Sequence, residues 1–226
     1  GEYIAFCDQD DEWDPRKIEK CVLKLEQDGT LLVATDRKII DGEGKVVCES
    51  VRHSSNKKYE TWNSFEDIGV YNFFTACAPG MSIVMDGPFA RSTVPFSEYT
   101  GHDKWVIECA NACGKLSYLD EPLVSYRRHG KNVSGVLEGI KSKKDYENER
   151  IIPHLELIRE FQKRYPSYQG TETALKFAEA RRNHNIIRLF KYRYLAPDIA
   201  KFEIVMAFLP DRLMQIIIRM LQKQRS

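Results

Sequence analysis

The chain has 226 residues, of which 42% are hydrophobic and 30% are charged. This composition is typical of a globular protein and excludes a disordered or fibrous one. The length suffices for one domain with an extension or for two small domains. The net charge of +1 conceals an asymmetry, since residues 1–140 carry a net charge of −7 and residues 141–226 carry +8. An acidic part followed by a basic part indicates different partners for the two, and we expect no nucleic acid among them.

The first predicted elements are a strand and a helix. Residues 3–7 are nearly all apolar, which predicts a buried strand. Asp14 suits a helix N-cap and Pro15 suits the first helical position, and apolar residues recur at helical spacing over residues 18–25. The helix is predicted to end at Gly29.

The middle of the chain predicts short strands and one strong helix. Strands are expected at four places: Leu31–Ile40, Lys45–Cys48, Met81–Met85 and Tyr118–Tyr126. The first two are joined by a glycine-containing turn at residues 41–44, and residues 51–62 are polar and predict a loop. Gly101–Cys113 predicts a helix that Gly114 ends.

The pattern changes after Gly135 and becomes helical. Charged helical patterns extend over three ranges: Lys141–Tyr165, Glu172–Tyr194 and Asp211–Lys223. We therefore predict one domain over residues 1–135 and a basic, helical extension over residues 136–226.

The six cysteines include no C-x-x-C pair and no spacing of a zinc site. Buried thiols in a reducing cytoplasm are the expected state. No stretch approaches the roughly 20 apolar residues of a membrane-spanning helix. The sequence therefore predicts a cytoplasmic protein, with peripheral attachment to the inner face of the plasma membrane as a further option.

Three carboxylates follow the first predicted strand: Asp8, Asp10 and Asp11. Such closely spaced acids repel one another, and a hard cation with oxygen ligands is the usual solution. Open α/β sheets also place their ligands at the carboxyl ends of strands. The alternative is a solvated acidic loop that precedes the helix.

Residues 1–17 closely resemble the D-x-D region of family 2 glycosyltransferases with the GT-A fold, whose members often have the pattern G-x-Y-I-A-F-x-D-x-D-D-x-W-x-P. The resemblance implies a nucleotide-sugar transferase with Mg²⁺ or Mn²⁺ as cofactor. It implies that Asp8 contacts the donor and that Asp8 and Asp10 bind the metal ion on the diphosphate. Asp11 becomes an additional carboxylate at the donor. Family members carry roughly two or three β-α units before this strand, so the chain is expected to be the C-terminal portion of a longer protein.

The segment from Tyr99 to Trp105 resembles the part of the family that supplies the catalytic base. The family's pair of Glu or His followed by Asp corresponds here to His102 and Asp103, so the resemblance assigns the base role to Asp103. Such a base takes the proton of the acceptor hydroxyl. A carboxylate in the first turn of a helix lies in a positive field and stays ionised. The alternative is that Asp103 only caps the helix.

The loop over residues 74–82 is similar to a family loop of small residues ahead of a short strand. Small side chains let the backbone approach a ligand closely. Gly80 and Met81 are therefore expected in the acceptor or sugar pocket, together with His102 and Trp105. The alternative is a plain tight turn.

Residues 118–135 match the family pattern Y-L-D-E-P-L-x-x-Y-R-x-H-G-x-N-x-S. Arg127 and His129 alternate along this extended segment, where a guanidinium and an imidazole suit the phosphate oxygens of the donor. His129 could instead be a metal ligand. The alternative is a basic strand end exposed to solvent.

Residues 211–223 have the pattern of a basic amphipathic helix, and the apolar residues 204–209 precede them. Such a helix suits docking on an anionic membrane surface, where transferases of this kind meet lipid-linked acceptors. The alternative is that its apolar face packs on the protein itself or on a second subunit.

The resemblance thus implies an α/β fold, a GT-A-like (Rossmann-like) transferase domain followed by a helical extension. The implied function is a metal-dependent, inverting glycosyltransferase that moves a sugar from a nucleotide-diphosphate donor to a hydroxyl of a glycan or lipid-linked acceptor in surface polysaccharide synthesis. The pattern D-Q-D-D-x-W at residues 8–13 resembles that of rhamnosyltransferase-like enzymes and favours such an enzyme. Two alternatives stay open: a non-catalytic interaction or membrane-docking fragment, and a metal-dependent nucleotidyl- or phosphotransferase. The donor sugar and the acceptor also stay open.

Overall fold

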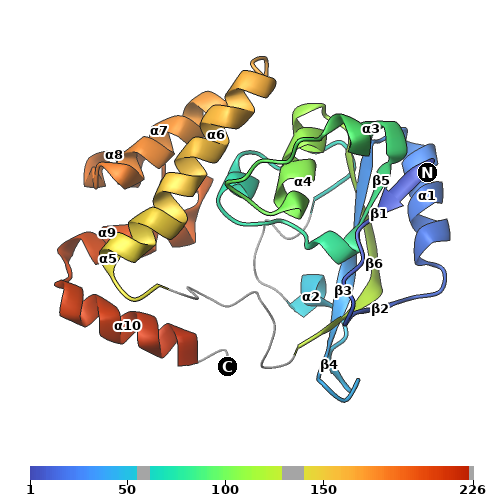
Figure 1. Ribbon diagram of the computed structural model, residues 1–226, viewed down its shortest axis with the longest axis horizontal. Coiled ribbons are helices and arrows are strands. Elements are labelled where there is room, and N and C mark those ends of the chain that lie inside the picture. Colours follow the sequence, from blue (N-terminus) through green and yellow to red (C-terminus); the bar gives the residue numbers. More distant parts are fainter. Residues whose placement is uncertain (55–61, 129–139, 224–226) are drawn as a thin grey trace. The chain divides into compact units, whose positions relative to one another are not determined.

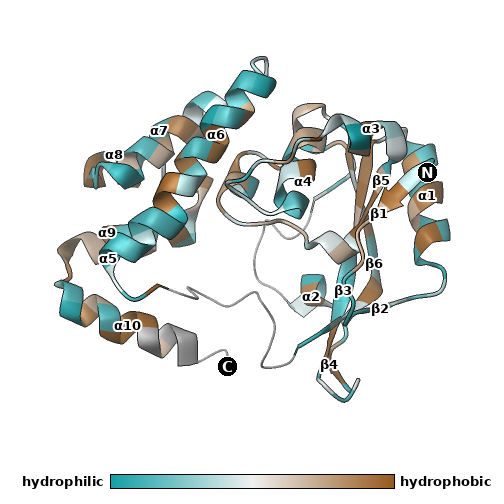
Figure 2. Ribbon diagram, viewed as in Figure 1, coloured by the Kyte–Doolittle hydropathy of each residue, from teal (hydrophilic) through white to brown (hydrophobic). Residues whose placement is uncertain are grey.

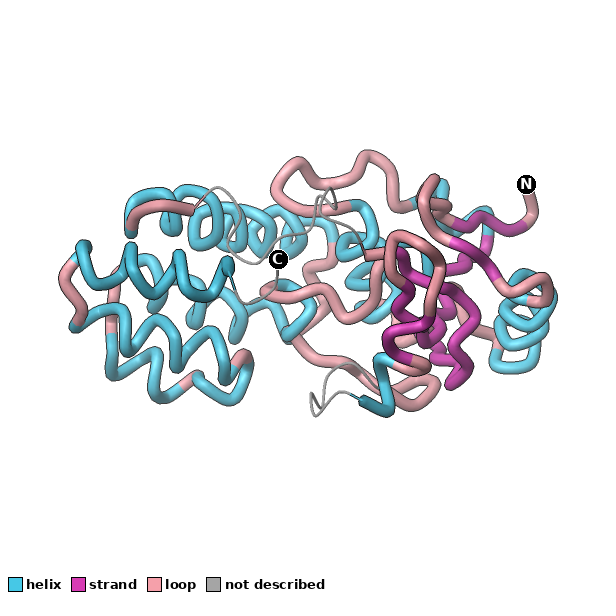
Figure 3. Tube along the Cα trace, turned by 90° about the horizontal axis from the view of Figure 1, so that it is seen from below, coloured by secondary structure: helices cyan, strands magenta, loops and turns pink. Residues whose placement is uncertain are grey.

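The computed structural model describes residues 1–54, 62–128 and 140–223. The chain divides into two compact units, Gly1–His129 and Gly130–Ser226. All strands of the described chain belong to the first unit, and the described part of the second is helical (Figures 1 and 3). The α/β class and the helical C-terminal part predicted from the sequence are confirmed. The predicted boundary between residues 135 and 136 lies outside the described residues.

The described residues of the first unit form one sheet of six strands. They are β1 (Tyr3–Ala5), β2 (Glu12–Trp13), β3 (Leu32–Ile40), β4 (Val46–Cys48), β5 (Ile83–Asp86) and β6 (Leu116–Arg127). The strand order is β1-β5-β3-β6-β2, and β4 pairs with β3. The β3–β6 pair is parallel and the other pairs are antiparallel. The two longest strands, β3 and β6, therefore lie together inside the sheet.

The strand β1 is shorter and more exposed than the sequence predicts. It ends at Ala5 instead of Cys7, and its three residues are half-buried. Among the described strands it pairs only with β5. The prediction of a buried strand was wrong here because an unbroken apolar run does not reveal how many neighbours a strand has.

Helices cover both faces of the sheet. In the first unit they are α1 (Lys17–Asp28), α2 (Val51–Ser54), α3 (Gly87–Ser92) and α4 (His102–Ala112). Cys21 and Leu25 of α1 pack on Val33, Val84 and Leu123. The alternate strand residues Ile4 and Met85 lie on the opposite face, where they line an apolar pocket with residues of α3 and α4. Figure 1 shows α1 on one side of the sheet and α4 on the other.

The helix α1 begins two residues later than predicted, because a short turn precedes it. Asp14 accepts a hydrogen bond from the backbone N–H of Arg16 at 2.9 Å with its side chain, and one from that of Lys17 at 2.9 Å with its carbonyl. This turn makes Arg16 the N-cap. The helix ends as predicted at Gly29, whose φ of 64° favours glycine.

The described part of the second unit consists of helices that bury an apolar core. They are α5 (Lys143–Tyr146), α6 (Ile152–Arg164), α7 (Gly170–Arg182), α8 (Ile186–Lys191), α9 (Pro197–Phe208) and α10 (Asp211–Lys223), and a π turn at Glu147–Ile151 joins α5 to α6. Met214 and Ile218 of α10 pack into a buried cluster with Tyr146 and Met206. Within the described chain, no helix combines the length and the apolar character that crossing a bilayer requires.

Candidate functional site

The acidic segment connects β1 to β2. Asp8 is exposed, whereas Asp10 and Asp11 are half-buried. Asp11 is directed towards β6, since its Oδ1 accepts a hydrogen bond from the backbone N–H of Arg127 at 2.9 Å. Its Oδ2 is buried without a hydrogen-bond partner among the described residues. Asp11 thus fastens the acidic segment to the sheet.

The charges of the acidic segment act on one another. Burial is the largest cause that raises the pKa of Asp11, and the carboxylates of Asp10 and Asp8 raise it further. The hydrogen bond from the backbone of Arg127 opposes this rise. The repulsion inferred from the sequence is therefore present in the fold, and a bound cation would relieve it.

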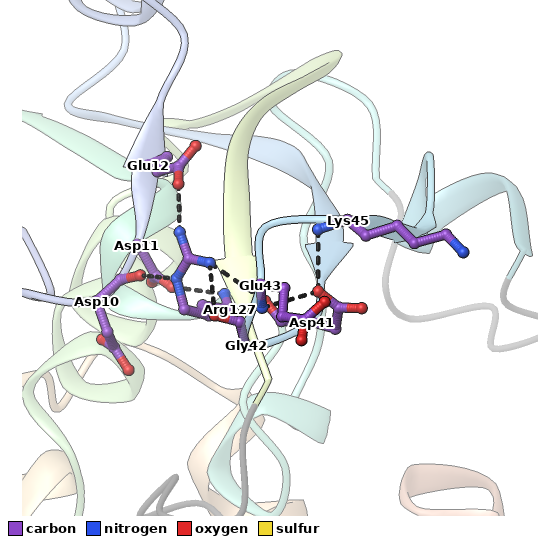
Figure 4. A network of polar contacts seen from close by, with 8 residues as sticks. All are labelled: Asp10, Asp11, Glu12, Asp41, Gly42, Glu43, Lys45 and Arg127. Carbon is purple, nitrogen blue, oxygen red and sulfur yellow. Dashed lines mark hydrogen bonds and ion pairs between the residues drawn. The ribbon is translucent and has the colours of Figure 1, made fainter.

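The side chain of Arg127 ties β6 to the acidic segment and to the turn that follows β3 (Figure 4). Its Nε donates to the carbonyl of Asp10 at 3.0 Å, its Nη1 donates to the carbonyl of Asp41 at 3.2 Å, and its Nη2 bonds and pairs with Glu12. Figure 4 shows the Asp10 carboxylate pointing away from this guanidinium. Arg127 was predicted to bind the donor. In the structure it bonds to protein oxygens and thereby holds the acidic segment in place, and its contact with the donor stays a prediction.

Three chain segments converge beside the acidic segment. A Cβ added at Gly80 would lie 3.0 Å from Nε2 of His102, 3.6 Å from Cβ of Asp103 and 3.6 Å from Cβ of Phe6. Phe6 precedes Asp8 by two residues. The structure therefore brings the loop before β5 and the start of α4 to the beginning of the acidic segment, and a side chain at position 80 would require His102 to shift.

Aromatic rings form one wall of this region. The ring centroids of Phe6 and His102 are 4.3 Å apart in an edge-to-face arrangement, and Phe96 lies 6.5 Å from Phe6 and 6.3 Å from His102. Phe6 and Phe96 also line an apolar pocket of about 140 Å³. The exposed His102 thus has an apolar surrounding on one side.

Asp103 lies in the first turn of α4 and is half-buried. The N-cap of α4 is Gly101, so Asp103 is not the N-cap residue itself. Oδ1 of Asp103 accepts a hydrogen bond from the backbone N–H of Lys104 at 2.8 Å. A Cβ at Gly101 would lie only 2.6 Å from the same oxygen. Glycine at position 101 therefore leaves room for the Asp103 carboxylate.

Two predicted pocket residues are core residues instead. The side chains of Met81 and Trp105 are each only 1% exposed. The indole of Trp105 donates to the carbonyl of Thr93 at 2.9 Å. Their side chains are therefore not available to an acceptor, and this part of the prediction is corrected. The predicted metal or phosphate ligand His129 lies outside the described residues.

Sequence reasoning missed Lys17, which is fully buried in the first turn of α1. Its Nζ donates to the carbonyl of Met81 at 2.5 Å and lies 3.4 Å above the centroid of the Trp13 ring. Burial lowers the pKa of Lys17 to about 8, although the neighbouring Cys21, Cys7 and Asp11 act to raise it. A lysine two positions after a proline carries no sequence signal that distinguishes it from a surface residue.

The described residues contain no group of three or more His, Cys, Asp or Glu side chains placed to hold a metal ion. Mg²⁺ is commonly bound through one or two carboxylates, with substrate phosphates and water as the remaining ligands. Asp8 and Asp10 fit that smaller requirement, whereas Asp11 is engaged with β6.

Residues 1–87 match the family model described as Glycosyl transferase family 2. The chain is also 27% identical over 135 residues to an uncharacterized glycosyltransferase, alr2836, of Nostoc sp. (strain PCC 7120). The alignment covers 58% of this chain and 41% of that protein, so the chain spans less than half the length of this relative.

Proposed function

We propose that the protein is an inverting glycosyltransferase that transfers a sugar from a nucleotide-diphosphate donor to an acceptor hydroxyl. The observation that supports it best is the convergence of Gly80, His102 and Asp103 on the segment that leads from Phe6 into the acids. In this arrangement the proposed base, Asp103, would lie beside the proposed site for the diphosphate and its metal. The match of residues 1–87 to a glycosyltransferase model supports the same function.

In the proposed reaction, the Asp103 carboxylate takes the proton of the acceptor hydroxyl. The acceptor oxygen forms a bond to the anomeric carbon while the bond from that carbon to the diphosphate oxygen breaks. A single displacement of this kind inverts the configuration. Asp10, assisted by Asp8, would hold Mg²⁺ or Mn²⁺, which neutralises the charge that develops on the diphosphate. His102 and the Gly80 backbone border the acceptor.

The variant Asp103→Asn tests the base assignment. Glu98→Gln is the control, because it makes the same kind of change at an exposed acid of the same region. After nucleotide sugars have been screened with the full-length protein, Asp103→Asn is expected to bind the donor normally and to lose roughly two or more orders of magnitude in turnover. Glu98→Gln should behave as the wild type. Wild-type turnover in Asp103→Asn, or a parallel loss of donor affinity, contradicts the base role.

The products of the same assay separate the proposed reaction from its enzymatic alternative. A glycosyltransferase releases the nucleoside diphosphate and leaves the sugar on the acceptor. A nucleotidyl- or phosphotransferase moves a phosphorus-containing group, so phosphate appears on the acceptor. Phosphorus NMR of the products distinguishes the two outcomes. We propose that the activity belongs to surface polysaccharide synthesis. The screen begins with a rhamnosyl-type donor because of the pattern D-Q-D-D-x-W at residues 8–13.

The helix α10 supports a peripheral contact with an anionic membrane surface, where a lipid-linked acceptor would be found. Leu213, Ile216 and Met220 are 48%, 48% and 59% exposed and share one face, and the basic Arg212 is exposed next to it. Figure 2 shows both hydrophobic and hydrophilic stretches along this helix. Such a face suits insertion at the headgroup level of an anionic bilayer. Ile217 of the same helix is half-buried and does not belong to this exposed face.

Substitution tests this contact better than truncation, because removal of α10 would uncover the core around Met214 and Ile218. Ile216→Glu is expected to abolish sedimentation with vesicles that contain phosphatidylserine, and Gln215→Glu, on the half-buried neighbouring position, adds the same charge as a control. Binding of the wild type should weaken with salt. If the wild type ignores these vesicles at low salt, the exposed face serves a protein contact and the membrane proposal fails.

A further inference from the structure

Buried polar side chains lie between α4 and the segment that precedes the loop of the candidate site. Asn72 is 0% exposed, Glu108 is 2% exposed and Asn111 is 4% exposed. Asn72 belongs to a short 3₁₀ turn at Tyr71–Phe73, and the other two belong to α4. Buried polar groups are costly unless they are hydrogen-bonded, so their bonds show what they hold together.

One amide connects the two halves of the site. Nδ2 of Asn72 donates to the carbonyl of Lys104 at 2.8 Å and to Oε2 of Glu108 at 3.0 Å. Oδ1 of Asn72 accepts a hydrogen bond from the backbone N–H of Cys77 at 3.1 Å. Lys104 directly follows Asp103, and Cys77 lies three residues before Gly80. Asn72 therefore links the first turn of α4 to the loop that approaches it.

Glu108 fixes the orientation of this amide. Its Oε2 accepts from Asn72, and its Oε1 is buried without a hydrogen-bond partner among the described residues. Burial raises the pKa of Glu108 to about 8, and the charge of Asp67 adds to the rise, while the hydrogen bonds from the side chains of Asn72 and Asn111 and the charge of Lys104 oppose it. Near neutral pH the side chain is therefore mainly a neutral acid, which needs fewer donors than a carboxylate does.

We propose that Asn72 and Glu108 are positioning residues that hold residues 75–80 against the first turn of α4, and that they do so only while Glu108 is a neutral acid. Ionisation would leave a buried charge with too few donors, a state that is relieved when water enters between α4 and the loop. Gly80 would then move away from His102 and Asp103. The consequence for turnover rests on the proposed function, whereas the contact itself does not.

The contact is tested by alkylation of buried thiols with iodoacetamide, located by peptide mass spectrometry. Cys77 reports on the loop, and the buried Cys21 of α1 reports on the rest of the unit. Glu108→Gln keeps the shape and the acceptor but cannot ionise. Wild type and variant are compared at the same pH, so that the ionisation of the thiols cancels.

At about pH 6.5 the ratio of Cys77 to Cys21 alkylation is expected to be equal in the two proteins. At about pH 9 the ratio in the wild type should exceed that in Glu108→Gln by at least about fivefold, because most of an acid is ionised one unit above its pKa. Equal ratios at the higher pH overturn the proposal. An increase in the alkylation of Cys21 together with that of Cys77 also overturns the proposal, because such an increase indicates opening of the whole unit.

The alkylation result does not depend on enzymatic activity, so it stands if the proposed function fails. If transfer is observed, turnover of the wild type should fall reversibly above about pH 8 with little change in KM for the donor, and Glu108→Gln should keep its turnover there. An alkaline loss that is identical in both proteins contradicts the positioning role even if Cys77 becomes reactive.

Discussion

Replacement of the buried Lys17 by methionine removes contacts that hold the segments around the candidate site together. Lys17 holds the carbonyl of Met81 at 2.5 Å and lies over the Trp13 ring, so it connects the acidic segment with the loop around Gly80. Methionine has a similar length and no charge. The substitution therefore removes a hydrogen bond to Met81 and a cation–π contact, and it also removes a charge that burial disfavours.

These effects differ in their dependence on pH. The pKa of Lys17 falls from 10.5 to about 8 in the fold. Between these values the unfolded chain binds a proton that the folded chain lacks, so the free energy of unfolding of the wild type rises with pH in this window. The shift of 2.5 units corresponds to about 3 kcal/mol. The lost hydrogen bond costs about 1–3 kcal/mol at any pH, whereas the lost ring contact costs about 1–2 kcal/mol only while Lys17 is charged.

Lys17→Met should therefore have nearly wild-type stability at neutral pH and should be less stable than the wild type at about pH 10. Urea unfolding of both proteins at several pH values measures this difference. The decisive quantity is the change of the stability difference between about pH 7.5 and pH 10.5, which should be about 3 kcal/mol. Parallel stability curves would refute the argument that Lys17 carries a buried charge near neutral pH.

Three other substitutions test the site. Arg127→Met should lower the free energy of unfolding by on the order of 3 kcal/mol, because charged hydrogen bonds to two other segments are lost. Loss of donor affinity at unchanged urea midpoint would instead restore the predicted phosphate role. Gly101→Ala should displace the Asp103 carboxylate and reduce kcat by about tenfold to a hundredfold, with donor affinity in equilibrium dialysis unchanged; a wild-type kcat contradicts this. Asp10→Ala should abolish metal-dependent nucleotide binding while circular dichroism shows the fold intact, and full activity in excess chelator would disprove the metal assignment.

The sequence predicted those elements whose signal is local. The helices around Trp105 and Met214 and the strand Leu32–Ile40 follow from apolar periodicity and from glycines at element ends. The approach of Gly80 to Asp103 was anticipated only through the resemblance to a family, because no local pattern connects positions that are so far apart in the chain.

Residues that act through distant contacts could not be predicted. Arg127 and Lys17 carry charges, so a sequence places them at the surface or at a ligand. In the structure their donors bond to backbone carbonyls of Asp10 and Met81. Carbonyl groups are present at every position and leave no trace in the residue types. The same reason hides the role of Asn72, whose three partners include two backbone groups.

The Arg127 network also has a consequence for biosynthesis. The acidic segment is made 117 residues before the arginine that fastens it. Ribosomes add about 5–20 residues per second, so Arg127 is synthesised roughly ten seconds after the acidic segment. During that time the acids are held neither by Arg127 nor by the end of β6. A nascent chain arrested shortly before this arginine should therefore present the acids in a form that a protease can cut, whereas the finished chain should protect them.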